Sequence, residues 1–82
     1  MIFDPVLTRL FIINAFSEPE FEQLCRSFFP DVYLRFSAES TWSEHIQLLI
    51  NHCERFGRFP QLMAVLESAK PTQYKQHFHL QI

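Results

Sequence analysis

The cysteines and histidines carry the most reactive side chains in this sequence. Cys25 and Cys53 are the two cysteines, and they do not form a CxxC motif. A nucleophilic cysteine needs an exposed, electropositive setting that favours its thiolate. Each of these cysteines instead falls in an apolar helical stripe, which predicts buried, reduced thiols. His52 precedes Cys53 and points about 100° away around a helix, so the two cannot form a local Cys–His dyad.

The four histidines lack the neighbours that a metal site requires. His77 and His79 form an H-x-H pair, and His45 and His52 lie seven positions apart. A protein metal site uses three or four ligands oriented by further hydrogen bonds. Glu44 lies beside His45, but no third ligand is placed there, and no cysteine or acidic residue lies near the tail pair. We expect no metal and no cofactor, with the tail pair on the surface and the other two histidines on a partly exposed helix face.

Other catalytic patterns are also missing from the sequence. Gly57 is the one glycine, whereas phosphate-binding loops need several so that backbone amides can approach an anion. No serine lies in a strained nucleophile-elbow motif, and paired carboxylates occur only where a helix is expected to start. We therefore predict that the chain is not an enzyme.

The charged residues form an acidic group and a basic group, and these are the candidate site residues. The acidic group opens the second expected helix, where carboxylates also stabilise the positive end of the helix dipole. The basic group lies in the middle segment and at the junction of the last two long helices. Opposite charges on opposite faces steer association between copies of a protein, although ordinary surface charge gives the same pattern. The protein-interaction candidates are Glu18, Glu20, Glu22, Arg35, Arg55 and Arg58.

Length and composition describe one small domain. The chain has 82 residues, of which 48% are hydrophobic and ten are Phe, so it can build a core and is not disordered. A domain of this size leaves little room for a deep substrate pocket. The net charge of −2 gives no electrostatic footprint for nucleic acid. No stretch reaches the ~20 apolar residues that span a membrane, and no signal peptide is visible, so a cytoplasmic location is expected.

Apolar periodicity and capping residues predict a helical fold. Asp4 and Pro5 are typical of a helix start and predict a first helix over 5–16. One stripe of this helix holds Val6, Leu7, Leu10, Phe11 and Asn14. Its apolar surface is widened nearly all round by Ile12, Ile13 and Phe16, so the helix is expected in the core or beneath a partner.

Three further long helices have clear boundaries. Capping boxes at 17–20 and 41–44 predict a second helix to about residue 28 and a long helix over 42–56 that ends at Gly57. A last long helix follows from 59 and ends before Pro71. Trp42, Leu49 and Leu66 are expected core positions. The phenylalanines expected to point inward are Phe11, Phe21, Phe28, Phe56 and Phe59.

Two segments are ambiguous. Residues 31–36 permit a strand, but the helices on both sides favour a short helix. The tail over 72–82 suits a short helix near Tyr74 followed by an extended end, or a strand docked at an edge. The sequence thus predicts an all-α fold, with a helical interaction domain at 1–73 and a C-terminal tail or the start of a linker at 74–82.

Two apolar patterns in the chain resemble those of a known family. The first is Ala15-Phe16, Phe21, Leu24 and Phe28-Phe29; the second is Leu49-Ile50, Cys53, Gly57-Arg58, Leu62 and Pro71. Together they cover roughly 6–72 and resemble the effector-associated domains, small helical modules of bacterial conflict and signalling proteins. The sequence departs from the family pattern at Pro60 and at Thr72, where an Asn-like residue is usual.

The resemblance implies a compact antiparallel bundle of five or six helices, similar to the death fold. It implies a non-catalytic adaptor that couples an effector to a sensor by homotypic association in bacterial defence signalling. The implied partner is a protein domain of the same family, a second copy of the chain included, and neither nucleic acid nor a membrane is expected.

The residues leave two other functions open. Two helices joined at Gly57 also suit a small helix-turn-helix DNA-binding regulator, although only Arg58, Gln61 and Lys70 qualify as base-reading residues. An apolar first helix also suits a free-standing regulatory subunit that packs against an unrelated protein.

Overall fold

The computed structural model describes residues 4–79. This range contains six helices and one π-helical turn, joined by short loops. The helices are α1 (Pro5–Ala15), α2 (Glu18–Phe28), α3 (Pro30–Tyr33), α4 (Trp42–Phe56), α5 (Phe59–Ala69) and α6 (Pro71–Tyr74), and the turn is η1 (Lys75–His79). Within this range no residue lies in a strand. The predicted all-α bundle is therefore confirmed.

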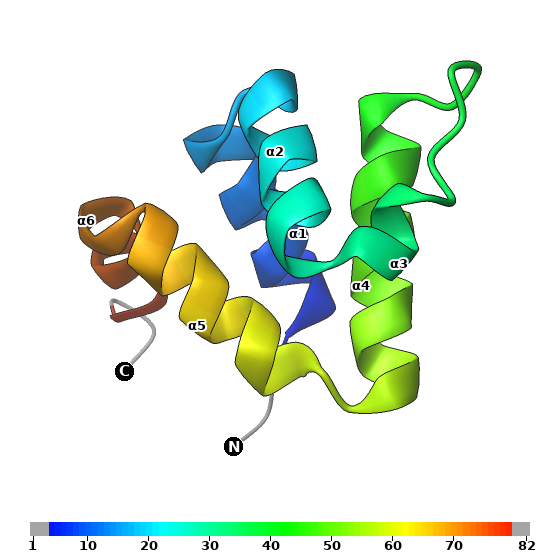
Figure 1. Cartoon of the computed structure of the whole chain (residues 1–82). Coiled ribbons are helices and arrows are strands. Elements are labelled where there is room, and N and C mark those ends of the chain that lie inside the picture. The colour runs from blue at the N-terminus through cyan, green and yellow to red at the C-terminus, as the bar shows by residue number, and fades with distance from the viewer. Residues whose placement is uncertain (1–3, 80–82) are drawn as a thin grey trace.

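The long helix α4 forms one side of the bundle and packs against α1, α3 and α5 (Figure 1). α1 and α2 run in roughly opposite directions through the centre, and α5 crosses obliquely to reach α6. The N-terminal ends of α2 and α4 lie at one end of the molecule. The turn between α4 and α5 lies at the opposite end.

Local sequence signals determine where the helices begin and end. The Asp4 carboxylate accepts two backbone N–H groups at the start of α1, and both predicted capping boxes, 17–20 and 41–44, are formed. Gly57 ends α4 with a φ of 65°, a left-handed conformation that side chains disfavour. A Cβ at this position would meet no heavy atom within 4 Å, so the requirement for glycine comes from the backbone rather than from space.

Apolar side chains from the first five helices, α1 to α5, form the core. Leu49 and Leu66 are fully buried as predicted, whereas Trp42 is partly buried and packs against the edge of the core. The largest fully buried apolar side chains are Phe11, Phe21, Phe29, Ile12, Ile46, Leu49, Ile50, Leu62, Leu66 and Val32.

The stripe identified on α1 does not coincide with the face that this helix buries. Thr8 is completely buried together with Phe11 and Ile12, whereas Val6 is 66% exposed and Leu10 is 45% exposed. The Thr8 hydroxyl donates a hydrogen bond of 2.8 Å to the Asp4 carbonyl, which satisfies its polar group inside the protein. Because the helix is apolar nearly all round, hydrophobicity alone could not identify which face points inward.

Two of the five phenylalanines expected inside are half-exposed. Phe28 is 51% exposed and Phe56 is 59% exposed, and each is the last residue of its helix. At both positions the chain turns immediately afterwards, and the next aromatic residue is buried instead. Phe29 follows α2, and Phe59 begins α5.

The two ambiguous segments are both helical. Residues 30–33 form α3, so the expected short helix is confirmed, and Val32 is its buried residue. Residues 75–79 continue the chain as a π-helical turn rather than an extended end. Tyr74 and Phe78 pack against the core through the Phe11 ring. The boundary at residue 73 stays a prediction, and residues 80–82 lie outside the described part.

Replacement of a core leucine tests this packing. We expect Leu49→Ala to lower the free energy of unfolding by about 2–5 kcal/mol, because it leaves a cavity in a fully buried position. The matched control is Leu34→Ala at an 81% exposed position, where the expected change is within about 0.5 kcal/mol. Urea unfolding followed by circular dichroism measures both, and similar losses from the two variants would contradict the assignment.

Candidate functional site

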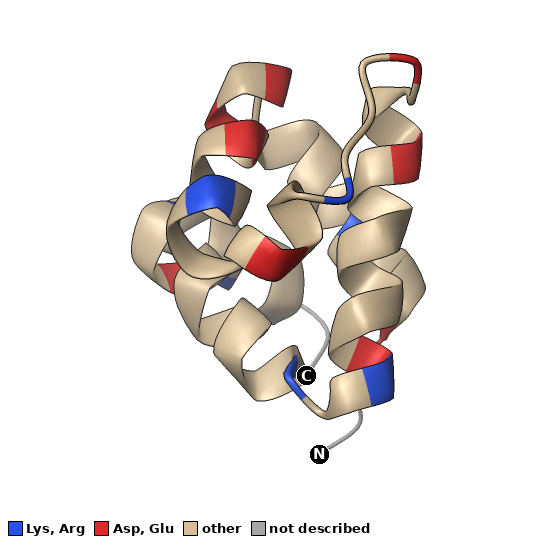
Figure 2. Cartoon of the chain, turned by 45° about the vertical axis from the view of Figure 1, so that its right-hand side comes forward, with Lys and Arg blue, Asp and Glu red and all other residues tan. Residues whose placement is uncertain are grey.

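The charged residues of the sequence-predicted site lie in three places: Glu18, Glu20 and Glu22 in the first turns of α2, Arg55 and Arg58 at the α4–α5 turn, and Arg35 in the loop after α3. Figure 2 shows acidic positions at the end that holds the first turns of α2 and α4, and basic positions at the α4–α5 turn, where Glu54 also precedes Arg55 in the last turn of α4. We call Arg55 and Arg58, at this turn, the basic corner; Arg58 contacts His52, and Arg35 in the loop after α3 also acts on this imidazole. A separation of this kind gives a small domain two electrostatically different faces.

The acidic group does not act as a single cluster, because Glu20 is engaged inside the domain. Its carboxylate accepts the backbone N–H of Ser17 at 2.9 Å and forms an ion pair of 2.9 Å with the Lys70 ammonium group. The hydrogen bond to Ser17 and the ion pair with Lys70 lower the Glu20 pKa from 4.5 to about 2. Sequence reasoning missed Lys70, which follows 50 residues later in the chain.

Glu18 and Glu22 remain available for contacts outside the domain. Neither makes a hydrogen bond or ion pair with another residue in the described range 4–79. Glu18 is exposed at the start of α2, whereas Glu22 is half-buried. Glu22 lines a hollow of about 350 Å³ that we call the α3 notch, together with Tyr33, Leu34, Phe36, Ser37, Ala38 and His45.

Arg58 is the most constrained residue of the basic corner. Its guanidinium donates hydrogen bonds of 3.1 Å to the His52 Nε2 atom and to the Gln61 side chain, and lies 4.9 Å from the centre of the Phe29 ring. These contacts join the end of α4, the start of α5 and the core. Arg58 therefore has a structural role that its position in the sequence did not reveal.

The pKa of His52 is lowered by burial and by the cations around it. Burial lowers the pKa of His52, and the Arg58 guanidinium lowers it further. Arg35 contributes in the same direction, and Asp31 opposes it. The structure thus brings Arg35 and Arg58, which are distant in sequence, close to the same imidazole.

Arg55 is less constrained than Arg58. It is exposed in the last turn of α4, and its guanidinium lies 5.6 Å from the centre of the Phe56 ring. It makes no hydrogen bond or ion pair within the described part of the chain. Arg55 and Phe56 therefore form a paired cation and aromatic ring on the surface.

The expected placement of His45 on a partly exposed face is wrong, whereas His77 is partly exposed. His45 is 4% exposed, because the Phe36 ring stacks on it with centres 4.0 Å apart and planes 5° apart. The His77 Nε2 atom donates a hydrogen bond of 2.9 Å to the Leu7 carbonyl, which ties η1 to α1. The side chain of His79 lies outside what the structure describes. No group of three or more metal-binding side chains gathers within the described residues.

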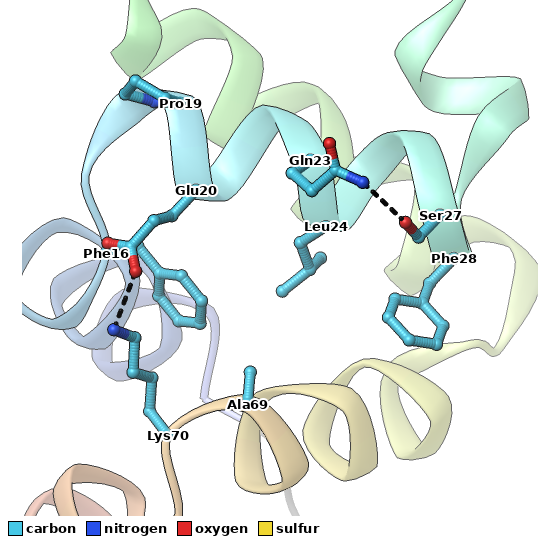
Figure 3. Close-up of a pocket in the computed structure, with 9 residues that line it drawn as sticks. All are labelled: Phe16, Pro19, Glu20, Gln23, Leu24, Ser27, Phe28, Ala69 and Lys70. Carbon is cyan, nitrogen blue, oxygen red and sulfur yellow. Dashed lines mark hydrogen bonds and ion pairs between the residues drawn. The ribbon is translucent and has the colours of Figure 1, made fainter.

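A second hollow, the α2–α5 groove, is lined mainly by apolar side chains (Figure 3). Phe16, Leu24, Phe28 and Ala69 face the space, which has a volume of about 480 Å³. The Glu20–Lys70 ion pair closes one end of it, and Gln23 donates a hydrogen bond of 3.3 Å to Ser27 along the edge. These polar side chains are already partnered, so the groove offers apolar surface.

The comparison with protein families decides what kind of domain this is. Residues 7–71 match the family model described as effector-associated domain 7. The chain belongs to this family. No curated protein and no solved structure matches the chain.

Family membership confirms the resemblance found in the sequence. An effector-associated domain is a module attached to effector proteins, which indicates an adaptor-type role for this chain. The matched range runs from α1 to the first residue of α6 and includes every candidate residue of both charged groups. In the described residues of this effector-associated domain, no helix is long and apolar enough to cross a membrane.

The two cysteines of the effector-associated domain are expected to resist thiol reagents. Burial raises the pKa of Cys25 to about 12 and that of Cys53 to about 11, so little thiolate forms at pH 8. We expect reaction with a disulfide reagent to be roughly 100-fold slower or more in the folded protein than in guanidinium. Rapid reaction of either thiol in the folded domain would contradict its burial.

The Glu20 contacts predict a loss of stability in acid. The folded domain keeps this carboxylate ionised below pH 4.5, whereas the unfolded chain binds a proton there. Its stabilising contribution is complete above pH 4.5 and is lost as the pH falls towards 2. We expect Glu20→Gln to flatten the fall in melting temperature over this range, and Glu18→Gln, which leaves the capping box intact, to leave the slope close to that of the wild type.

Proposed function

We propose that this chain is a non-catalytic adaptor domain that couples an effector to a sensor through contact with domains of its own family. The family assignment to residues 7–71 is the observation that carries the proposal. The partner is a protein domain of the same fold, a second copy of this chain included. The adaptor acts in the bacterial cytoplasm, in conflict or defence signalling, as a death-fold-like module.

The distribution of charge supports contact between copies. Heterologous contact between identical domains needs two different surfaces that complement each other. Glu18 and Glu22 at one end and Arg55 at the other are charged residues without an ion pair in the described range. Opposite charges at separate ends accelerate the encounter and select the relative orientation of two domains.

Exposed apolar side chains also support an interaction role. Val6, Leu10 and Ile13 form a stripe at i, i+4 and i+7 on the outer face of α1, and each is more than one third exposed. Apolar patches on a small domain are typical of surfaces that bind other proteins.

The helix-turn-helix alternative finds less support. The helix after Gly57 is α5, and it buries five residues in the core. Its exposed positions are Pro60, Gln61, Ala64, Glu67, Ser68 and Ala69, which include one acid and no base. A recognition helix instead presents cations and amides to phosphates and base edges.

Binding to a panel of domains tests the proposal. We expect the purified chain to bind itself or another effector-associated domain, and not an unrelated helical bundle of similar charge. Light scattering after size exclusion and biolayer interferometry measure the two forms of contact. The affinity is expected to fall as salt rises, because the contact involves unpaired surface charges. A strict monomer that binds no domain of the family would contradict the proposal.

A further inference from the structure

The α3 notch presents a carboxylate beside apolar side chains, which suits a partner group that carries a cation next to an apolar group. Its one carboxylate, Glu22, is half-buried and makes no hydrogen bond or ion pair within the described residues, and Arg26, one turn later on α2, is its electrostatic neighbour. Leu34 projects beside it with 81% of its surface exposed, and Tyr33 and Phe36 provide the surrounding apolar wall. An isolated leucine this exposed contributes little to the folding of its own domain.

The walls of the notch are held in place by contacts within the domain. The Phe36 ring lies between Phe21 and the buried His45, with ring centres 6.2 and 4.0 Å away. Arg26 donates a hydrogen bond of 3.0 Å to the Tyr33 hydroxyl and lies over its ring. Because these side chains are already fixed, a partner that enters the notch orders few additional groups.

The basic corner presents the matching chemistry at the other end of α4. Arg55 is exposed and unpaired in the described range, and Phe56 beside it is 59% exposed. Arg55 thus places a cation next to an exposed apolar ring. In the same way, the notch places the Glu22 carboxylate next to the exposed Leu34 side chain. Arginine and aromatic residues are the types that most often dominate binding energy at protein interfaces.

The two surfaces cannot meet within one copy. His45 lines the notch in the first turn of α4, and Arg55 lies ten residues further along the same helix. Ten residues correspond to about 15 Å along the helix axis, which is beyond the reach of an arginine side chain. Any pairing between Arg55 and Glu22 therefore joins two molecules.

We infer that Arg55 and Phe56 of one copy dock in the α3 notch of a second copy. Arg55 pairs with Glu22, and Phe56 covers Leu34, which removes an exposed apolar side chain of each copy from water. This inference rests on the proposed homotypic function and specifies its contact. Because the notch and the corner are different surfaces, each copy keeps one of them free, and the contact is heterologous and head-to-tail.

The other charged candidates are less suited to this contact. Glu20 is held by Ser17 and Lys70, and Arg58 is held by His52 and Gln61. Using them in an interface would first break hydrogen bonds inside the domain. Glu22 and Arg55 carry no such cost. Glu18 and Arg35 are also without side-chain hydrogen bonds or ion pairs in the described range, but Glu18 does not line the notch, and Arg35 lies between the notch residues Leu34 and Phe36.

Charge reversal on each surface provides the experiment. Glu22→Arg and Arg55→Glu in the full chain are each expected to weaken self-association by roughly tenfold or more in sedimentation velocity. An equimolar mixture of the two variants is expected to associate again, because the intact Arg55 of one meets the intact Glu22 of the other. Circular dichroism establishes that each variant remains folded.

Matched controls separate this contact from general charge and apolar effects. Glu67→Arg and Lys75→Glu reverse the same charges at exposed positions elsewhere and are expected to leave self-association unchanged. Phe56→Ala is expected to weaken it, whereas Phe28→Ala, which removes a similarly exposed ring from the α2–α5 groove, is not.

The outcomes distinguish this contact from the proposed function. If the wild type associates and both reversals leave it unchanged, docking in the notch is wrong while homotypic association stands. If each reversal disrupts association and the mixture remains monomeric, the pairing of these two surfaces is wrong. A wild type that remains monomeric at millimolar concentration overturns self-association itself, and the family panel then decides the proposed function.

Discussion

The apolar stripe of α4 is the surface on which the other helices depend. Ile46, Leu49, Ile50 and Cys53 are at most 1% exposed, and α1, α3 and α5 pack against this helix. A chain of 82 residues buries a smaller fraction of its surface than a larger protein does, so one well-covered helix carries much of its stability. Aromatic rings fill the remaining space because each buries a large area for one residue. The polar contacts of the domain, such as the Arg9 hydrogen bonds to Ser43 and Gln47, then fix how α1 lies on α4.

The sequence predicted the structure well where the signal is local, as at helix caps, or where a helix has clearly separate apolar and polar faces. Capping boxes at 17–20 and 41–44 and the glycine at 57 predicted helix ends that the structure confirms. α4 has a clear apolar period, and Leu49 and Cys53 are buried as predicted, whereas His45 and Phe56 are not where they were expected. α1 lacks that contrast, and its inward face depends on Thr8, whose hydroxyl is satisfied by a carbonyl one turn earlier. Phe28 and Phe56 were misplaced because a stripe predicts direction only while the helix continues.

The candidate site was predictable in composition but not in its internal connections. The acidic candidates lie on α2 and two of the basic ones at the α4–α5 turn, yet sequence spacing could not show that Glu20 pairs with Lys70. It also could not show that Arg58 contacts His52 and the Phe29 ring. Such contacts join residues that are far apart in the chain, and they arise only when the helices have packed. They divide the charged residues into those that hold the domain together and those that remain for a partner.

The notch and the basic corner lie near opposite ends of one straight helix of 15 residues. At 1.5 Å per residue, the ten residues from His45 to Arg55 separate them by about 15 Å, and the buried stripe of α4 holds this helix in the bundle. Copies joined through these two surfaces would therefore be added at a constant step and with a constant rotation. The spacing of the two surfaces along α4 sets the step between copies. The geometry of a closed ring or an open filament then depends on the rigid core of each domain rather than on a flexible linker.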